Sequence, residues 1–270
     1  MSRQVLVLVD PLARRADGES VRIAKDVLCA GAEARVCLPE GPEEFAKALA
    51  RRGARRPVVI GDDRALLRAV SLLHRERELA ESVLSMIPVG GAVALARSLG
   101  IPCGAVAAAR AALDGSERRL DLLVDDSDGV VLGELRIPPL TQPPADPDGA
   151  ARPWLRTCRS LVRTLAPRPA RPTGQVPGPP ARLRIEADGA TLLDLDQPVR
   201  HVSVGPATGT GLARLEIHRT PDAPPLRASA RTITVTGPDF RYRTDTVAIA
   251  GPVRRRMWTV REGAWRLALP

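Results

Sequence analysis

The residues most suited to chemistry follow a short apolar segment at 58–60. Gly61, Asp62, Asp63 and Arg64 come directly after it, and a helix-period pattern begins at once. Such a strand-to-helix turn can bind anions, because the first helical N–H groups are unpaired and the helix dipole is positive there. The segment therefore predicts a phosphate site on the turn.

The side chains of this turn allow two interpretations. Asp62 adds a negative charge that opposes phosphate binding unless a divalent cation lies between them, and Arg64 could contact a phosphate as a bidentate donor. Alternatively, Asp62 or Asp63 only caps the following helix and Arg64 is solvated. The sequence leaves both interpretations open.

A second glycine turn, with Gly90 and Gly91, follows an apolar segment at 83–87 and precedes a helical pattern at 92–99. In parallel α/β sheets, turns of this kind lie together at the carboxyl edge, where ligands bind. We therefore expect Gly61, Gly90 and Gly91 to line one cleft.

The elements that position these turns alternate between strand and helix. Apolar runs predict parallel strands, and apolar residues at helical spacing predict the intervening helices. The strands are expected at 5–9, 34–38, 58–60 and 83–87, and the helices at 20–30 (capped by Ser20), 42–51, 63–79 and 92–99. This pattern predicts a Rossmann-like parallel α/β domain over residues 1–113.

The remainder of the chain, 114–270, has a different pattern. Short alternating segments bounded by turn residues predict an antiparallel β-sandwich domain. Proline-rich loops are expected at about 137–153 and 167–180, around a helical pattern with a basic face at 154–165. The fold class is therefore α/β plus all-β. The strands are expected near 120–124, 130–135, 182–186, 201–204, 213–218, 232–235, 246–249, 258–260 and 265–269.

Composition limits the possible partners. The chain has 270 residues and a formal net charge of +9, which suggests a polyanionic partner, but aromatic residues make up only 2% and supply no stacking platforms for single strands. No nucleic acid partner is expected. A basic cluster at Arg254, Arg255 and Arg256 gives a less supported alternative function, in which the protein binds a polyanion or a membrane surface.

The spacing of the cysteines and the N-terminal segment indicate the cellular compartment of the protein. The four cysteines form no C-x-x-C pair, which argues against a zinc site and a disulfide framework. The apolar run at 5–9 is too short for a signal peptide or a membrane span. We expect a cytoplasmic protein without a transmembrane segment.

The second glycine turn carries the strongest family resemblance. The segment 87–102, IPVGGAVALARSLGIP, resembles the I-P-x-G-T-x-N-D-x-A-R-x-L-G-I-P motif of diacylglycerol kinases and related bacterial lipid kinases, in the superfamily that includes NAD kinases. The spacing is kept, but Gly91, Val93 and Ala94 replace the Thr, Asn and Asp of the motif.

Three further segments extend the resemblance over nearly the whole chain. The first turn is similar to G-G-D-G-T-L-N, with Asp62 and Arg64 in place of glycines. Asp10 and Pro11 resemble the Asn-Pro turn of the family. Asp245 stands at the start of the D-G-E motif, whose Glu, the base in such kinases, is replaced by valine. The residues 264–270 match the family's usual ending.

The resemblance implies an ATP- and Mg²⁺-dependent kinase that phosphorylates a lipid hydroxyl, converting diacylglycerol to phosphatidic acid at a membrane surface. It implies catalytic roles for Asp63 and Asp245 and nucleotide-binding roles for Asp10, Gly61, Asp62, Arg64, Gly90 and Gly91. The metal ligands are left unassigned. The departures remove polar and backbone contacts that phosphoryl transfer requires, so we expect weak or lost activity. The alternative is a catalytically silent nucleotide- or lipid-binding regulatory module.

Overall fold

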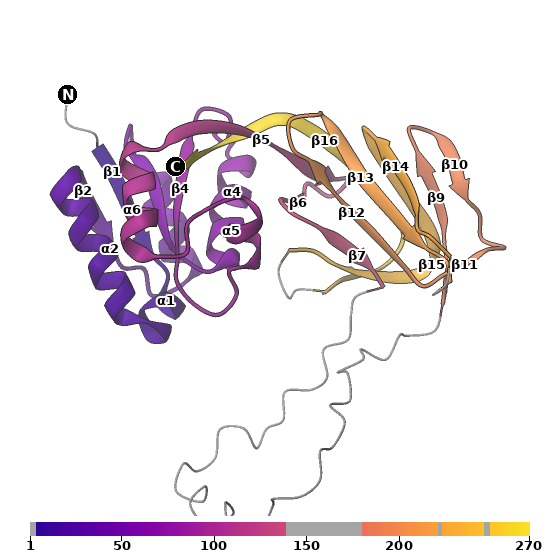
Figure 1. The fold of residues 1–270 in the computed structure, drawn as a ribbon, viewed down its shortest axis with the longest axis horizontal. Helices are drawn as coiled ribbons and strands as arrows, with labels where there is room; N and C mark the ends of the chain where they lie inside the picture. Colours follow the sequence, from indigo (N-terminus) through magenta and orange to yellow (C-terminus); the bar gives the residue numbers. More distant parts are fainter. Residues whose placement is uncertain (1–3, 139–179, 221–222, 246–248) are drawn as a thin grey trace, which may run out of the picture.

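The computed structural model describes residues 4–138, 180–220, 223–245 and 249–270. A helical part with a parallel sheet forms one end of the molecule, and a part built from antiparallel strands forms the other (Figure 1). The helix expected at 154–165 and most of both proline-rich loops lie outside the described residues.

The parallel sheet has the strand order β2-β1-β3-β4. Apolar residues fill these strands because helices cover both faces. Helices α2 and α6 pack on one face, and α3, α4 and α5 pack on the other. The predicted parallel α/β architecture is therefore confirmed. The strands are β1 (Gln4–Val9), β2 (Glu33–Cys37), β3 (Arg56–Gly61) and β4 (Val83–Pro88).

The helices agree with the predicted pattern in four places and extend it in two. The predicted ones are α2 (Gly18–Gly31), α3 (Pro42–Ala50), α4 (Asp63–Arg75) and α5 (Ala94–Ser98). The sequence did not predict α1 (Pro11–Ala16) or α6 (Ala105–Asp114), which is so rich in alanine that its apolar periodicity is weak.

Two predicted helix boundaries were wrong. Ser20 does not cap α2, because the carboxylate of Asp17 accepts a hydrogen bond from the Ser20 backbone N–H and the helix starts at Gly18. Helix α4 ends at Arg75 instead of continuing to residue 79.

Two long strands connect the ends of the molecule. Strand β5 (Ser116–Asp125) pairs antiparallel with β16 (Ile249–Leu269), and the last residues of β16 pair in parallel with β4. The segment at 265–269 is thus the end of β16, held against the α/β core by Trp265 and Leu267. The division of the chain into two domains at residue 113 stays a prediction.

The antiparallel strands surround a second core, which includes Trp258, Val202 and Ile233. Their order, β14-β13-β12-β7-β15-β16, confirms the β-rich second half of the fold. The strands are β6 (Val130–Val131), β7 (Leu135–Ile137), β8 (Ala181–Arg182), β9 (Arg184–Ala187), β10 (Ala190–Leu193), β11 (Pro198–Val199), β12 (His201–Ala207), β13 (Leu212–His218), β14 (Leu226–Ala230) and β15 (Thr232–Arg243).

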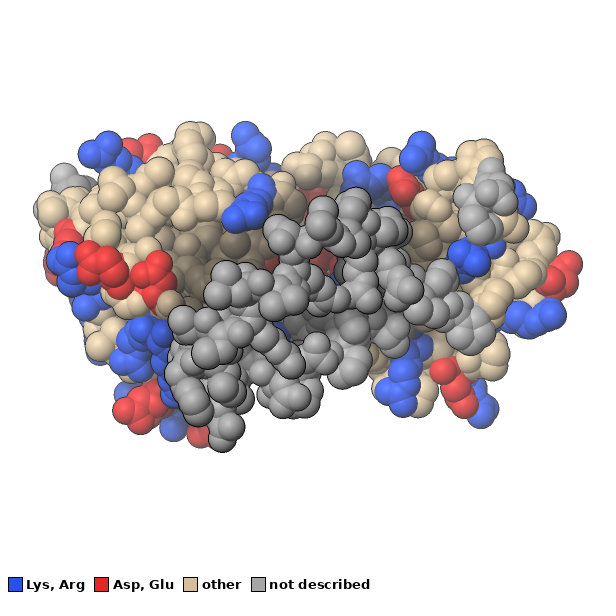
Figure 2. All heavy atoms as spheres, turned by 60° about the horizontal axis from the view of Figure 1, so that its bottom comes forward, with Lys and Arg blue, Asp and Glu red and all other residues tan. Residues whose placement is uncertain are grey.

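Charged side chains of both signs are interspersed over the face shown in Figure 2. Within the basic cluster expected on the sequence, Arg254 pairs with Asp239 at 3.2 Å and Arg256 pairs with Asp126 at 2.6 Å. These ion pairs reduce the charge that the cluster presents to a polyanion. Among the described helices, none has the length and apolarity required to cross a membrane.

Candidate functional site

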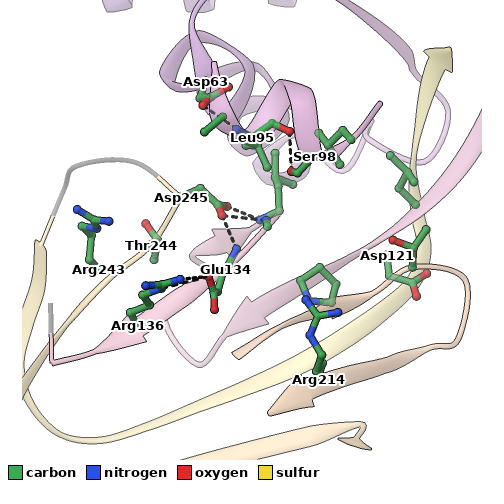
Figure 3. Close-up of a pocket in the computed structure, with 17 residues that line it drawn as sticks. Asp63, Leu95, Ser98, Asp121, Glu134, Arg136, Arg214, Arg243, Thr244 and Asp245 are labelled. Carbon is green, nitrogen blue, oxygen red and sulfur yellow. Dashed lines mark hydrogen bonds and ion pairs between the residues drawn. The ribbon is translucent and has the colours of Figure 1, made fainter. Parts of the chain in front are cut away.

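A cavity of about 630 Å³ lies between the α4–α5 corner and the strands β5, β7, β12, β13 and β15. Its charged lining comes from segments far apart in sequence (Figure 3). The acidic side chains are Asp63, Asp121, Glu134 and Asp245, and the basic ones are Arg136, Arg214 and Arg243. A cavity of this size matches a small-molecule site.

Asp63 is the first residue of α4 and joins the two glycine turns. Its carboxylate accepts hydrogen bonds from the backbone N–H groups of Leu95 and Ala96, at 2.9 and 3.0 Å, and so caps α5. Its own backbone N–H donates to the carbonyl of Ala92 at 2.8 Å. Burial raises the pKa of Asp63, and the neighbouring charge of Asp62 adds to this rise, while the backbone donors oppose it.

Asp245, on the opposite wall, accepts hydrogen bonds from three successive backbone N–H groups. The donors are Leu132 at 2.6 Å, Gly133 at 2.9 Å and Glu134 at 2.6 Å. Burial raises the pKa of Asp245, the three donors oppose the rise, and the negative charge of Asp63 adds to it. The structure therefore brings the two predicted catalytic carboxylates to one cavity, where backbone donors engage both.

In the first glycine turn, a residue of the turn itself caps the following helix. Asp62 precedes α4, and its Oδ1 accepts hydrogen bonds from the backbone N–H groups of Arg64 at 3.0 Å and Ala65 at 3.2 Å. The interpretation in which Asp62 caps the helix is thus confirmed, and the Arg64 side chain is exposed. At Gly61 an added Cβ would lie 2.6 Å from the Ala65 Cβ, so the chain requires glycine there.

These contacts bear on whether the turns fit the phosphates of ATP. A phosphate site at a helix N-terminus needs free backbone N–H groups. At α4 the carboxylate of Asp62 already occupies them, and at α5 the carboxylate of Asp63 does. At the second turn, Gly91 leaves open space and Gly90 has a φ of +124°, so a ligand can approach that backbone closely. The first turn therefore does not fit a nucleotide phosphate.

Asp10 is the last of the predicted site residues, and a metal site is the last feature to consider. Asp10 is buried, caps α1 through the Leu12 N–H at 2.8 Å and forms an ion pair with Arg68 at 2.9 Å. Within the described part of the chain, no group of three or more His, Cys, Asp or Glu side chains could hold a metal ion. The predicted residues that do not line the 630 Å³ cavity are Asp10, Gly61, Asp62, Arg64, Gly90 and Gly91.

Sequence reasoning missed most of the cavity's charged residues. Asp121 lies on β5, Arg136 on β7, Arg214 on β13 and Arg243 on β15. Only the sheet register brings them together, and no spacing between them signals a site. Asp245 was found because it falls within a family motif, two residues after Arg243.

No protein-family model matches the sequence, and no curated protein matches it at a significant level. Solved structures do. A diacylglycerol kinase structure from Bacillus anthracis str. Sterne aligns with 100% of this chain and 97% of its own, at 15% identity and a TM-score of 0.73. Another structure from that organism, provisionally assigned as a diacylglycerol kinase, covers 100% of this chain and 98% of its own, at 14% identity and a TM-score of 0.74.

A more distant match extends the comparison to a second kind of kinase. An NAD kinase from Archaeoglobus fulgidus, in complex with ATP, aligns with 98% of this chain and 93% of its own, at 13% identity and a TM-score of 0.51. At these identities the comparison establishes the fold. The resemblance predicted on the sequence is confirmed at that level: the chain has the fold shared by the diacylglycerol kinase and NAD kinase structures.

Proposed function

We propose that the chain is a catalytically silent, diacylglycerol kinase-like protein that binds a ligand in its central cavity. The observation that carries this proposal is the position of Asp62, whose carboxylate accepts the N–H groups of Arg64 and Ala65. A phosphate at this turn would have to displace that carboxylate and then remain close to its charge. Two unit charges about 4 Å apart repel by about 4 kcal/mol at an effective dielectric constant near 20.

The opposite wall supports the same proposal. A phosphoryl acceptor needs a base within reach of its hydroxyl proton. Valine replaces the Glu of the family motif at position 247. Asp245, its nearest substitute, accepts three backbone hydrogen bonds, which orient its oxygens toward the chain.

A second candidate function is an ATP-dependent lipid kinase of low activity. It is favoured by one observation, that Asp63 and Asp245 line one cavity and both have a raised pKa, as suits a general base. The ATP bound in the NAD kinase structure supports nucleotide use by this fold. This candidate requires ATP with Mg²⁺, and diacylglycerol in a membrane as acceptor.

The two candidates are separated by incubating the purified chain with labelled ATP, Mg²⁺ and diacylglycerol vesicles. The silent protein yields no labelled phosphatidic acid above a control without protein. Labelled product that is lost in the Asp245→Asn variant, while that variant keeps its circular dichroism spectrum, would establish the lipid kinase instead. Product formed equally by wild type and variant would indicate a contaminating kinase, which a second purification must remove before the test is read.

A further inference from the structure

Two arginines lie directly opposite each other on the β side of the cavity. Strands β15 and β7 pair antiparallel with Arg243 as the register partner of Arg136. Both side chains line the cavity, together with Thr244, as Figure 3 shows. Like charges on directly opposed residues of an antiparallel pair destabilise the sheet. The carboxylate of Glu134 offsets the charge of Arg136, and a bound anion would offset that of Arg243.

The carboxylates of the cavity already have donors. Asp63 and Asp245 accept backbone N–H groups as described, and Asp121 accepts those of Gly211 at 3.1 Å and Gly263 at 2.8 Å. The remaining acid, Glu134, accepts two hydrogen bonds from the Arg136 side chain, at 3.1 and 3.0 Å. Each carboxylate is therefore engaged by the protein itself.

The guanidinium groups are not matched in the same way. Among the described residues, the side chain of Arg243 has no hydrogen-bond or ion-pair partner, nor has that of Arg214, which lines the cavity from β13. Arg136 uses Nε and Nη2 for Glu134, so its Nη1 has no partner in the described part of the chain. The binding capacity left on this wall consists of cationic donors.

We propose that Arg136 and Arg243 bind the phosphate of a phosphate monoester in this cavity. Guanidinium groups donate paired hydrogen bonds that match phosphate oxygens, and the Thr244 hydroxyl lies beside them as a further donor. The volume of about 630 Å³ accommodates a small organic group on the phosphate. This inference rests on the proposed function in one respect, that the cavity binds a ligand. It does not depend on the absence of phosphoryl transfer.

The test is isothermal titration calorimetry of the full chain with glycerol 3-phosphate, with glycerol as the blank. Vesicles of phosphatidylcholine with and without phosphatidic acid form a second arm. The variant is Arg243→Gln, which removes the charge from a partly exposed side chain. The matched control is Arg241→Gln, because Arg241 lies two residues earlier on the same strand, is exposed and does not line the cavity.

We expect binding by wild type and by Arg241→Gln, and at least about tenfold weaker binding by Arg243→Gln. Binding of glycerol 3-phosphate would identify a soluble ligand, and binding only to phosphatidic acid vesicles would identify a lipid headgroup. Equal binding by Arg243→Gln and wild type, or no binding in either arm, would overturn the site. Labelled product that is lost in the Asp245→Asn variant would refute the silent function and leave this binding result unaffected.

Discussion

Replacement of Asp62 by glycine tests the central argument about the first turn. The substitution removes the carboxylate that accepts the N–H groups of Arg64 and Ala65 and restores the glycine found at this position in the family motif. We expect the Asp62→Gly variant to bind ATP with Mg²⁺ more tightly than wild type does. The Asp62→Asn variant keeps an acceptor oxygen for the cap and removes only the charge.

The size of the effect follows from the contacts. Each freed N–H group can donate to a charged phosphate oxygen, and such a hydrogen bond contributes about 1.5–3 kcal/mol. One new bond therefore raises affinity about 10- to 100-fold. Replacing an N-cap Asp by Gly lowers stability by only a few tenths of a kcal/mol. We expect Asp62→Asn to gain less than Asp62→Gly, because its amide oxygen still occupies the helix N-terminus.

The assay is calorimetric titration of ATP with Mg²⁺ into the wild type and both variants at millimolar ligand. Asp17→Gly is the matched control, because Asp17 caps α2 in the same way and lies outside the cavity lining. The pKa of Asp63 provides a second readout. Because the charge of Asp62 raises this pKa, the loss of Asp62 should lower it. If Asp62→Gly binds ATP no better than Asp17→Gly, intramolecular capping does not limit nucleotide binding.

Three further predictions concern stability, measured by urea unfolding. Gly61→Ala should lower the free energy of unfolding by about 1–3 kcal/mol, because its Cβ would lie 2.6 Å from another side chain, whereas Gly91→Ala meets open space and should change it little. Arg68→Met should lower it by about 2 kcal/mol, because the buried carboxylate of Asp10 loses its ion-pair partner; an unchanged midpoint would contradict this. Because the pKa of Asp245 is raised in the folded state, its contribution to the free energy of unfolding is complete below pH 3.8. That contribution is lost as pH rises through the folded-state pKa. Asp245→Asn should therefore show a shallower decline above pH 3.8, and parallel profiles would refute the assigned shift.

Local patterns were sufficient for the four parallel strands and for four of the helices that pack on them. Continuous apolar runs such as 5–9 occur where both faces of a strand are buried, and the glycine turns mark where those strands end. Helix α6 escaped prediction because alanine gives little contrast between its buried and exposed faces. The predicted cap at Ser20 was wrong because Asp17, three residues earlier, supplies a carboxylate to its backbone N–H.

The sequence by itself determined the four parallel strands with four of their helices, the two glycine turns and the resemblance in fold, because these depend on residues close together in the chain. Tertiary structure alone decided what those turns can bind. Two interpretations of Asp62 were open on the sequence, and only the position of its carboxylate against the α4 N–H groups distinguishes them. The pairing of Arg136 with Arg243 likewise depends on strand register across 107 residues, which no local pattern encodes.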